Sequence, residues 1–380
     1  MKSKLLYLVI FLAVGFACFA QNNAKETKDT AIVYFCSNIT PENVLKMYEA
    51  LGVKLPGQIG LKVHFGERGN QNYLDPNLLR PLVDKVRPTF VETNVLYVSD
   101  RRFTNSHIAL AKEHGFTFAP IDILDAEDEL VYSTAGMNFK YCKTVKTGTH
   151  FDNYDSFIIY SHFKGHGSAG FGGAIKNVAM GMASPGGKMA MHANTFPVTC
   201  NTNQCTQCQR CVQQCPAMAI SVDDKGPVID TTKCIGCAKC LAECPKRLFM
   251  TNNDNFSEEA FLDKLVEYAK VLSEQRPMLY INVLANISEL CDCSSKAPAP
   301  FMGDIGIVSS TDIVAIDRAS HDLVAAMQGK KEAFRHKNKV KAKHQLDYAE
   351  QLGMGTQTYI LIDIATGQQI TLKQAIKQTK

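Results

Sequence analysis

Two copies of one cysteine motif constrain the fold of this 380-residue chain more than any other feature. The first copy, CTQCQRCVQQCP, begins at Cys205, and the second, CIGCAKCLAECP, begins at Cys234. Each copy has the spacing C-x2-C-x2-C-x3-C-P. Three thiolates two residues apart can bind three corners of a cubane cluster, whereas the fourth leaves that loop and binds the partner cluster. The motif therefore predicts an interlocked pair of loops around two [4Fe-4S] clusters.

This spacing is typical of bacterial ferredoxins. The predicted ligand sets are Cys205, Cys208, Cys211 and Cys244 for one cluster, and Cys234, Cys237, Cys240 and Cys215 for the other. Disulfides and structural zinc are alternatives, but neither explains a doubled spacing with a proline after each fourth cysteine. Two adjacent clusters form a short electron path, so the segment is predicted to relay single electrons to or from a redox partner protein. A structural role for the clusters is the alternative.

On both sides of this motif, short β-branched runs alternate with amphipathic segments. AIVYFC, from Ala31, precedes TPENVLKMYEAL, in which Thr40 is the predicted N-cap. A later helical pattern has Thr311 as its predicted N-cap. Alternation of this kind favours βαβ units, and hence a largely parallel sheet with flanking helices.

The alternation is interrupted by the cysteine motifs and then resumes. The predicted fold class is α/β, with an inserted small α+β domain of the ferredoxin type at residues 197–255. The first part of the α/β domain is predicted at residues 31–196 and its second part at residues 256–380.

The N-terminus predicts export. Two lysines precede an apolar run at residues 5–20, and a polar stretch follows, which is the order of a secretory signal peptide of residues 1–20, cleaved after Ala20. An uncleaved anchor on a cytoplasmic protein and acylation at Cys18 are alternatives. No later run approaches the roughly 20 apolar residues of a membrane helix, so no multi-span membrane protein is expected. With 41 basic and 37 acidic residues, the charge gives no reason to expect nucleic acid.

A glycine-rich stretch, SHFKGHGSAGFGGAIKN, begins at Ser161 between a strand-like run and a helical pattern. Glycines let backbone N–H groups approach a ligand, and the N-terminus of the next helix favours an anion. A nucleotide site is disfavoured because no Asp or Glu follows in MASPGGKMAMHAN. The stretch therefore predicts a pocket for an unidentified small molecule or metal, with Lys164 as a solvated loop charge. The candidate cofactor-binding residues are Gly165, Gly167, Gly170, Gly172 and Gly173, and the candidate catalytic residues are His162, His166, Lys176 and His192.

Four further cysteines lie outside the motifs in informative contexts. Cys36 and Cys142 lie in apolar runs and are predicted to be buried thiols. Cys291 and Cys293 flank Asp292 and form a weaker candidate for a metal-binding or redox pair. Packing, or disulfides to other cysteines, are the alternatives for this pair.

The chain also resembles a known family, the bacterial and archaeal proteins of domain of unknown function 362, often labelled iron-sulfur center proteins. The resemblance covers nearly the whole mature chain and follows the family's order of motifs, which are LKVHFGERGN, VETNVLY, HFKGHGSAGFGGAIKNVAMG, GKMAMH, NISELCDC and DIGIVSSTDIVAIDRASHDL. Some members have no cysteine insertion, and many begin at the strand that matches AIVYFC. The resemblance implies an architecture and a redox association, and it implies no substrate.

Together these features predict an iron-sulfur redox protein, with an oxidoreductase of unknown substrate as the candidate enzyme class, in which the clusters exchange electrons with a ligand bound by the α/β domain. A non-enzymatic electron carrier is the first alternative. The second is a binding or maturation factor whose clusters are structural or sense redox state.

Overall fold

The computed structural model describes residues 30–97, 99–192, 197–251 and 257–379. The predicted signal peptide lies outside these residues. Within them, no helix combines the length and the apolar character that crossing a membrane requires.

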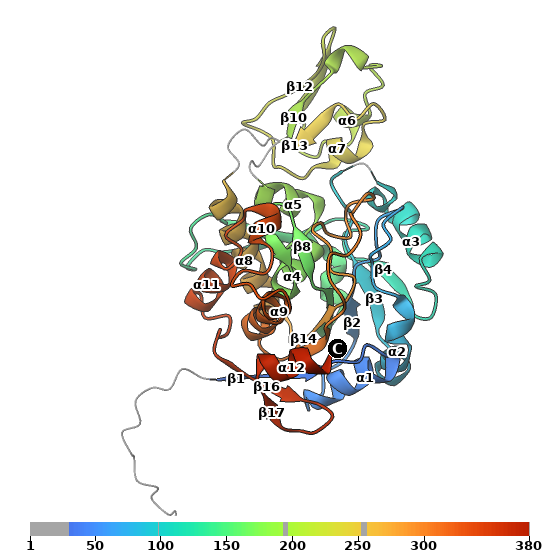
Figure 1. The fold of residues 1–380 in the computed structure, drawn as a ribbon. Coiled ribbons are helices and arrows are strands. Elements are labelled where there is room, and N and C mark those ends of the chain that lie inside the picture. Colours follow the sequence, from blue (N-terminus) through green and yellow to red (C-terminus); the bar gives the residue numbers. More distant parts are fainter. Residues whose placement is uncertain (1–29, 98, 193–196, 252–256, 380) are drawn as a thin grey trace, which may run out of the picture.

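A nine-stranded sheet forms the centre of the molecule (Figure 1). The strands from β14 to β4 are parallel, and so are β1 and β16, whereas β15 and β17 run antiparallel to their neighbours. In spatial order the strands are β17 (Gln369–Ile370), β16 (Tyr359–Asp363), β1 (Ala31–Cys36), β15 (Gly306–Ser310), β14 (Met278–Leu284), β7 (Ser156–His162), β2 (Ile59–Lys62), β3 (Thr89–Glu92) and β4 (Ile121–Ile123). The predicted α/β class with a largely parallel sheet is confirmed.

Helices cover both faces of this sheet because its strands are apolar on both faces. In β7, Phe157 and Ile159 face one core, whereas Ile158 and Tyr160 face the other. Large apolar side chains buried in this way each contribute about 1.5–3 kcal/mol. The first core contains α4 (Ala174–Met182), α8 (Glu258–Gln275), α9 (Ile313–Met327), α11 (His344–Gln351) and α12 (Leu372–Gln378). The second contains α1 (Pro41–Ala50), α2 (Arg80–Val86) and α3 (Thr104–Glu113).

Helix N-caps follow the sequence prediction in one case and depart from it in another. Thr40 caps α1, as predicted, by accepting a hydrogen bond from the Asn43 backbone N–H at 3.2 Å. The prediction for α9 is wrong, because Asp312 is its cap and not Thr311. The Asp312 carboxylate accepts from the first turn of α9, with both bonds at 2.8 Å, and also from Thr356 N at 2.9 Å. An ionised carboxylate is a stronger acceptor than a hydroxyl, and here it also binds the C-terminal segment.

The cysteine-rich segment, residues 197–251, forms a small body above one end of the sheet (Figure 1). It has a core of its own, to which Met189 of α5 (Pro185–His192) also belongs. Lys146 bonds the Ile235 carbonyl at 2.8 Å, which is a further contact with the main body. The elements of the cysteine-rich segment are β10 (Pro197–Thr199), paired with β13 (Phe249–Thr251); β11 (Ile220–Asp223), paired with β12 (Gly226–Ile229); and the short helices α6 (Arg210–Gln213) and α7 (Lys239–Glu243).

Candidate functional site

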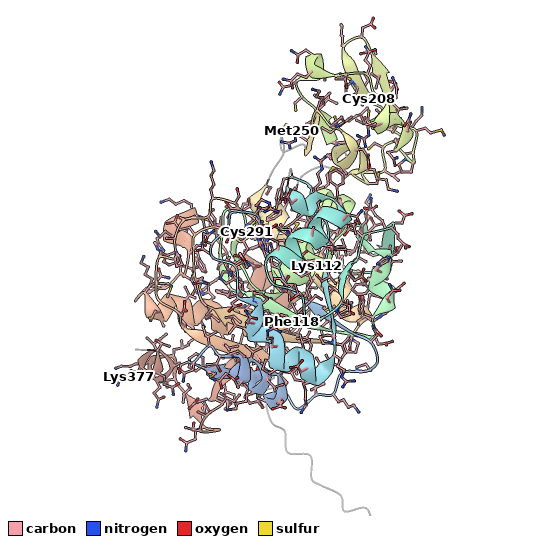
Figure 2. All side chains as sticks on the ribbon, turned by 90° about the vertical axis from the view of Figure 1, so that its right-hand side faces the viewer. Lys112, Phe118, Cys208, Met250, Cys291 and Lys377 are labelled. Atoms are coloured by element: carbon pink, nitrogen blue, oxygen red, sulfur yellow. A yellow bond between two sulfur atoms is a disulfide. The ribbon has the colours of Figure 1, made fainter. Side chains whose placement is uncertain are left out.

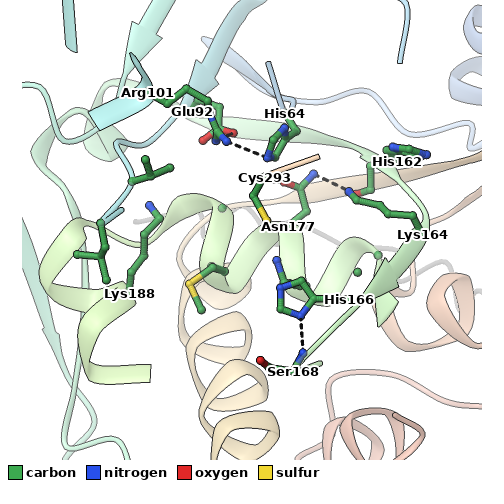
Figure 3. Close-up of a pocket in the computed structure, with 18 of the residues that line it drawn as sticks. His64, Glu92, Arg101, His162, Lys164, His166, Ser168, Asn177, Lys188 and Cys293 are labelled. Atoms are coloured by element: carbon green, nitrogen blue, oxygen red, sulfur yellow. Dashed lines mark hydrogen bonds and ion pairs between the residues drawn. The ribbon is translucent and has the colours of Figure 1, made fainter. Parts of the chain in front are cut away.

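A pocket of about 310 Å³ lies at the carboxyl ends of the parallel strands β14, β7, β2 and β3 (Figure 3). Open α/β sheets bind ligands at this end, where the loops that follow neighbouring strands converge. The polar residues lining the pocket are His64, Glu92, Tyr97, Arg101, Ser161, His162, Lys164, His166, Ser168, Lys176, Asn177, Lys188 and His192. All four predicted catalytic candidates are thus brought together here.

The glycine-rich stretch folds as a hairpin, β8 (Lys164–His166) and β9 (Gly170–Gly172), so it is not the strand-to-helix turn of a dinucleotide site. Two of its glycines are needed for close packing. A Cβ on Gly165 would collide with the Glu289 carbonyl oxygen, and Gly170 has φ +76° and a Cβ position that Ala342 occupies, whereas Gly167 has open space around it. Of the five predicted glycines, Gly172 and Gly173 line the pocket, whereas Gly165, Gly167 and Gly170 do not.

The N-terminus of α4 does not supply the predicted anion site. Its first N–H groups, on Ala174 and Ile175, donate to the buried carboxylate of Asp317 at 2.7 and 2.9 Å. A carboxylate of α9 therefore already satisfies the backbone donors that sequence reasoning assigned to a ligand. Burial nevertheless raises the pKa of Asp317 to about 6.

Positive side chains dominate the pocket. Arg101 donates to Glu92 at 3.0 Å, and Lys62 lies 3.7 Å from the same carboxylate and 2.9 Å from Asn177 Oδ1. Lys188 donates to the Ala183 carbonyl at 2.6 Å. Burial lowers the pKa of Lys62 and that of Lys188 to about 8. Burial opposes ionisation of Glu92 as well, but Lys62 and Arg101 outweigh it and hold the pKa of this carboxyl well below its usual value.

Lys164 belongs to the same pocket, so the prediction of a solvated loop charge is wrong. It is buried, and its ammonium lies 3.2 Å from the Asp292 carboxylate. Residues after β7 and after β14 meet at this pair because the two strands are parallel neighbours.

Lys176, on α4, is the cation that the protein leaves without a partner. Within the described residues, no hydrogen bond or ion pair engages its ammonium. Burial, followed by repulsion from Lys164, lowers its pKa to about 7. An enclosed and unpaired cation costs free energy, so Lys176 is suited to receive an anion from outside the chain.

The three predicted histidines have different surroundings. His162 Nε2 donates to the Ala285 carbonyl at 2.6 Å, and Nδ1 lies 2.9 Å from both carboxylate oxygens of Asp292, so both ring nitrogens are engaged. His166 Nδ1 accepts from the Ala169 N–H at 2.9 Å, which places the proton of the neutral ring on Nε2. Burial lowers the pKa of His166 well below its usual value and that of His192 to about 4, with Lys176 as the next cause for both.

The eight motif cysteines line two small cavities in the cysteine-rich segment, and none of them forms a disulfide. One cavity is lined by Cys205, Cys208, Cys211 and Cys244, and the other by Cys215, Cys234, Cys237 and Cys240. These are the two sets that the crossed spacing predicts. Backbone N–H groups donate to sulfur in both sets: Gln207 to Cys205 at 3.4 Å and Ala219 to Cys215 at 3.2 Å.

The two motif copies share an unusual backbone. Positive φ angles recur at equivalent positions, in the pairs Gln207 and Gly236, Gln209 and Ala238, and Met218 and Arg247. Such angles are uncommon for residues other than glycine and persist only where the surroundings demand them. Here they occur in the loops whose first three thiols line one cavity and whose fourth thiol lines the other.

Cys291 and Cys293 form a disulfide with each other in the loop after β14. Their sulfurs and a ring nitrogen of His166 lie within 4.8 Å of one another. Figure 2 shows Cys291 in the main body and Cys208 in the cysteine-rich segment. Of the two predicted buried thiols, Cys36 is buried and Cys142 is partly buried.

An open crevice of about 1170 Å³ separates the pocket from the cysteine-rich segment. Tyr97 and Cys293 line both the pocket and this crevice, and Cys244 of the cysteine-rich segment lines the crevice as well. The pocket and the crevice are therefore neighbours, and the crevice reaches Cys244, which also lines one of the four-cysteine cavities.

Sequence reasoning did not single out His64, Glu92, Arg101, Lys188 or Asp292 as site residues, although they line or support the pocket. One signal was present. Lys62 and Glu92 end the apolar strands β2 and β3, where a buried charge requires a partner or a ligand.

The comparisons with known proteins identify a family and little else. A model described as domain of unknown function (DUF362) matches residues 59–322. No curated protein matches the chain. A crystal structure of a protein from Thermotoga maritima is similar at 12% identity and a TM-score of 0.37, covering 74% of this chain and 57% of that one. The lactate racemase apoprotein from Thermoanaerobacterium thermosaccharolyticum is similar at 14% identity and a TM-score of 0.33, covering 72% of this chain and 54% of that one. The chain thus spans little more than half the length of either.

Replacement of the unpaired cation should stabilise the protein. The pKa of Lys176 is about 7 in the folded state, below the usual 10.5 of the unfolded chain. Protonated Lys176 therefore lowers the free energy of unfolding by its full amount below pH 7, and this loss of stability disappears as the pH rises toward 10.5. We expect Lys176→Met to raise stability by on the order of 1–3 kcal/mol near pH 7 and by much less at pH 10. Thermal unfolding at both pH values measures this. Lys164→Met is the matched control and should destabilise, because it leaves Asp292 without its lysine; equal effects of the two variants would contradict the assignment.

Proposed function

The chain belongs to the family of domain of unknown function DUF362, and on that premise we propose that it is an iron-sulfur redox protein. In this proposal, two [4Fe-4S] clusters in the cysteine-rich segment exchange electrons with a small anionic molecule bound in the cationic pocket. The enzyme class suggested is an oxidoreductase.

The two cysteine cavities support [4Fe-4S] clusters over the alternatives. All eight thiols are free, which disfavours disulfides. A single zinc ion with Zn–S bonds of about 2.3 Å would hold its sulfurs within about 4.6 Å of one another. Among the described residues, the groups compact enough for one metal ion are His166 with Cys291 and Cys293, and Glu259 with Asp263 and His344, and the motif cysteines form none. The N–H···S bonds suit a cluster, whose sulfurs accept such bonds.

The unpaired ammonium of Lys176 is the observation that favours an anionic ligand. Three lysines and one arginine line the pocket, and Lys62 lies behind them, near two carboxylates, Glu92 and Asp292. Those carboxylates serve Lys62, Arg101 and Lys164, so Lys176 is left for an external negative charge. A cavity of about 310 Å³ suits a small carboxylate or phosphate.

The clusters would supply single electrons, and the chain's own residues would bind and orient the ligand. The Lys176 ammonium faces the anion, and the His166 Nε2–H is a donor for a second ligand atom. His162 and Lys164 hold Asp292, which keeps the loop after β14 against the pocket. A non-enzymatic carrier would leave the unpaired Lys176 without explanation.

The clusters can be tested by their composition. Protein isolated without oxygen should contain about eight iron and eight sulfide and give paramagnetic signals on reduction. Cys208→Ala should lose about half of the iron or more, whereas Cys200→Ser, a matched control just outside the motif, should retain it. Stoichiometric zinc without sulfide would end the proposal.

Ligand affinity should fall with rising pH. Only protonated Lys176 binds an anion well, so above its free pKa of about 7 each pH unit should weaken binding by up to tenfold. Calorimetry with malonate from pH 6.5 to 9 measures this, because malonate itself does not titrate there. Lys176→Met should lose most of the affinity and the part of its pH dependence that lies near pH 7. Lys54→Met, at an exposed lysine, should behave as wild type. A fall in affinity between pH 6.5 and 7.5 that survives in Lys176→Met would exclude the assigned role, since Lys188, with a pKa of about 8, titrates mainly above that range.

We also propose that the protein is exported, on the basis of the N-terminal sequence. Cell fractionation with N-terminal sequencing tests this, and the mature chain should begin at Gln21. Protein with an intact Met1 in the cytosolic fraction would refute export.

A further inference from the structure

We propose that Cys291 and Cys293 form a two-electron redox site between the cysteine-rich segment and the pocket. In this role the disulfide is reduced to a dithiol by electrons that arrive through the clusters. The proposal rests on the proposed function for its electron source and adds the group that would collect an electron pair beside the bound ligand.

The position of the pair supports this role. Cys293 lines the pocket (Figure 3) and also the crevice, which Cys244 lines as well. Among the residues described, Cys293 is the one cysteine that lines both the pocket and the crevice. An electron that leaves the cluster bound by Cys244 therefore meets this disulfide on the way to the pocket.

The loop around the pair is held by contacts that do not involve sulfur. Asp292, between the two cysteines, is buried and ion-paired with His162 and Lys164, and its carbonyl accepts from the Glu67 N–H at 3.0 Å. Asn70 donates to the Ser294 carbonyl at 2.7 Å. Because these contacts remain when the S–S bond opens, the two thiols stay close together and the bond can form again.

Cationic side chains near the pair would stabilise a thiolate that forms on reduction. Lys164 and Lys176 line the same pocket as Cys293, and nearby cations stabilise thiolates. His166 lies within 4.8 Å of both sulfurs, and its protonated Nε2 is the nitrogen left available to donate.

The electron balance fits two clusters. Cleavage of the S–S bond takes two electrons and two protons and yields two thiols. A [4Fe-4S] cluster delivers one electron, so the reduced pair of clusters supplies what one disulfide requires, and solvent in the crevice supplies the protons. Oxidation of the dithiol returns both electrons and both protons and restores the bond.

Reductive titration of the anaerobic holoprotein, with dithionite and methyl viologen, tests the proposal. Wild type should take up about four electrons, two in the clusters and two in the disulfide. The double variant Cys291→Ser/Cys293→Ser should take up about two. Cys200→Ser should match wild type, since that thiol lies outside both sites.

Alkylation with iodoacetamide, followed by peptide mass analysis, reports whether the pair is a disulfide or a dithiol, and this measurement needs no substitution at Cys291 or Cys293. Cys291 and Cys293 should be blocked before reduction and doubly alkylated afterwards. In Cys208→Ala the reduction should be at least tenfold slower, whereas a phosphine reductant should open the bond equally in both proteins.

The possible failures are distinct. Fully reduced clusters beside an intact disulfide would overturn this inference and leave the proposed function standing. Absence of iron and sulfide would end the proposed function itself. Thiols that are reduced but protected from alkylation by one bound zinc would show that the pair and His166 form a metal site, and would also overturn the redox role.

Discussion

Burial of positive charge at the carboxyl end of the parallel strands is the constraint on which the rest of the structure depends. A charge removed from water costs several kcal/mol unless it is paired and hydrogen-bonded. Glu92 and Asp292 offset much of that cost, and the loops after β3, β7 and β14 are arranged around these two carboxylates. The charge that remains, on Lys176, is the part of the cost that the fold does not offset by itself.

The pocket and the cysteine-rich segment are joined through one helix. Lys188 and His192 of α5 line the pocket, whereas Met189 of the same helix packs in the core of the cysteine-rich segment. A displacement of α5 at the cysteine-rich segment would therefore also move side chains that line the pocket. The crevice gives the same two regions a second connection, across Tyr97 and Cys293.

Several features of the site were predictable and others were not. The cysteine sets follow from local spacing, which fixes how far each thiol can reach. The role of Lys164 was predicted incorrectly because its partner, Asp292, is 128 residues away in the sequence and adjacent only through the pairing of β7 with β14. The N-terminus of α4 was likewise predicted to bind an anion, because its actual partner, Asp317 of α9, is also distant in the sequence.

The sequence by itself determined the α/β class, the presence of a pocket near the glycine-rich stretch and the grouping of the eight motif cysteines. These depend on periodicity and short spacings, which act within a few residues. Only the tertiary structure decided that Cys291 and Cys293 bond to each other, and that Glu92, Arg101 and Lys188 share a pocket with Lys176. It also decided that Lys176 alone among these cations has no partner in the described chain. The reason is physical: the charge state and availability of a buried group depend on neighbours that the order of strands brings together, and no local pattern records that order.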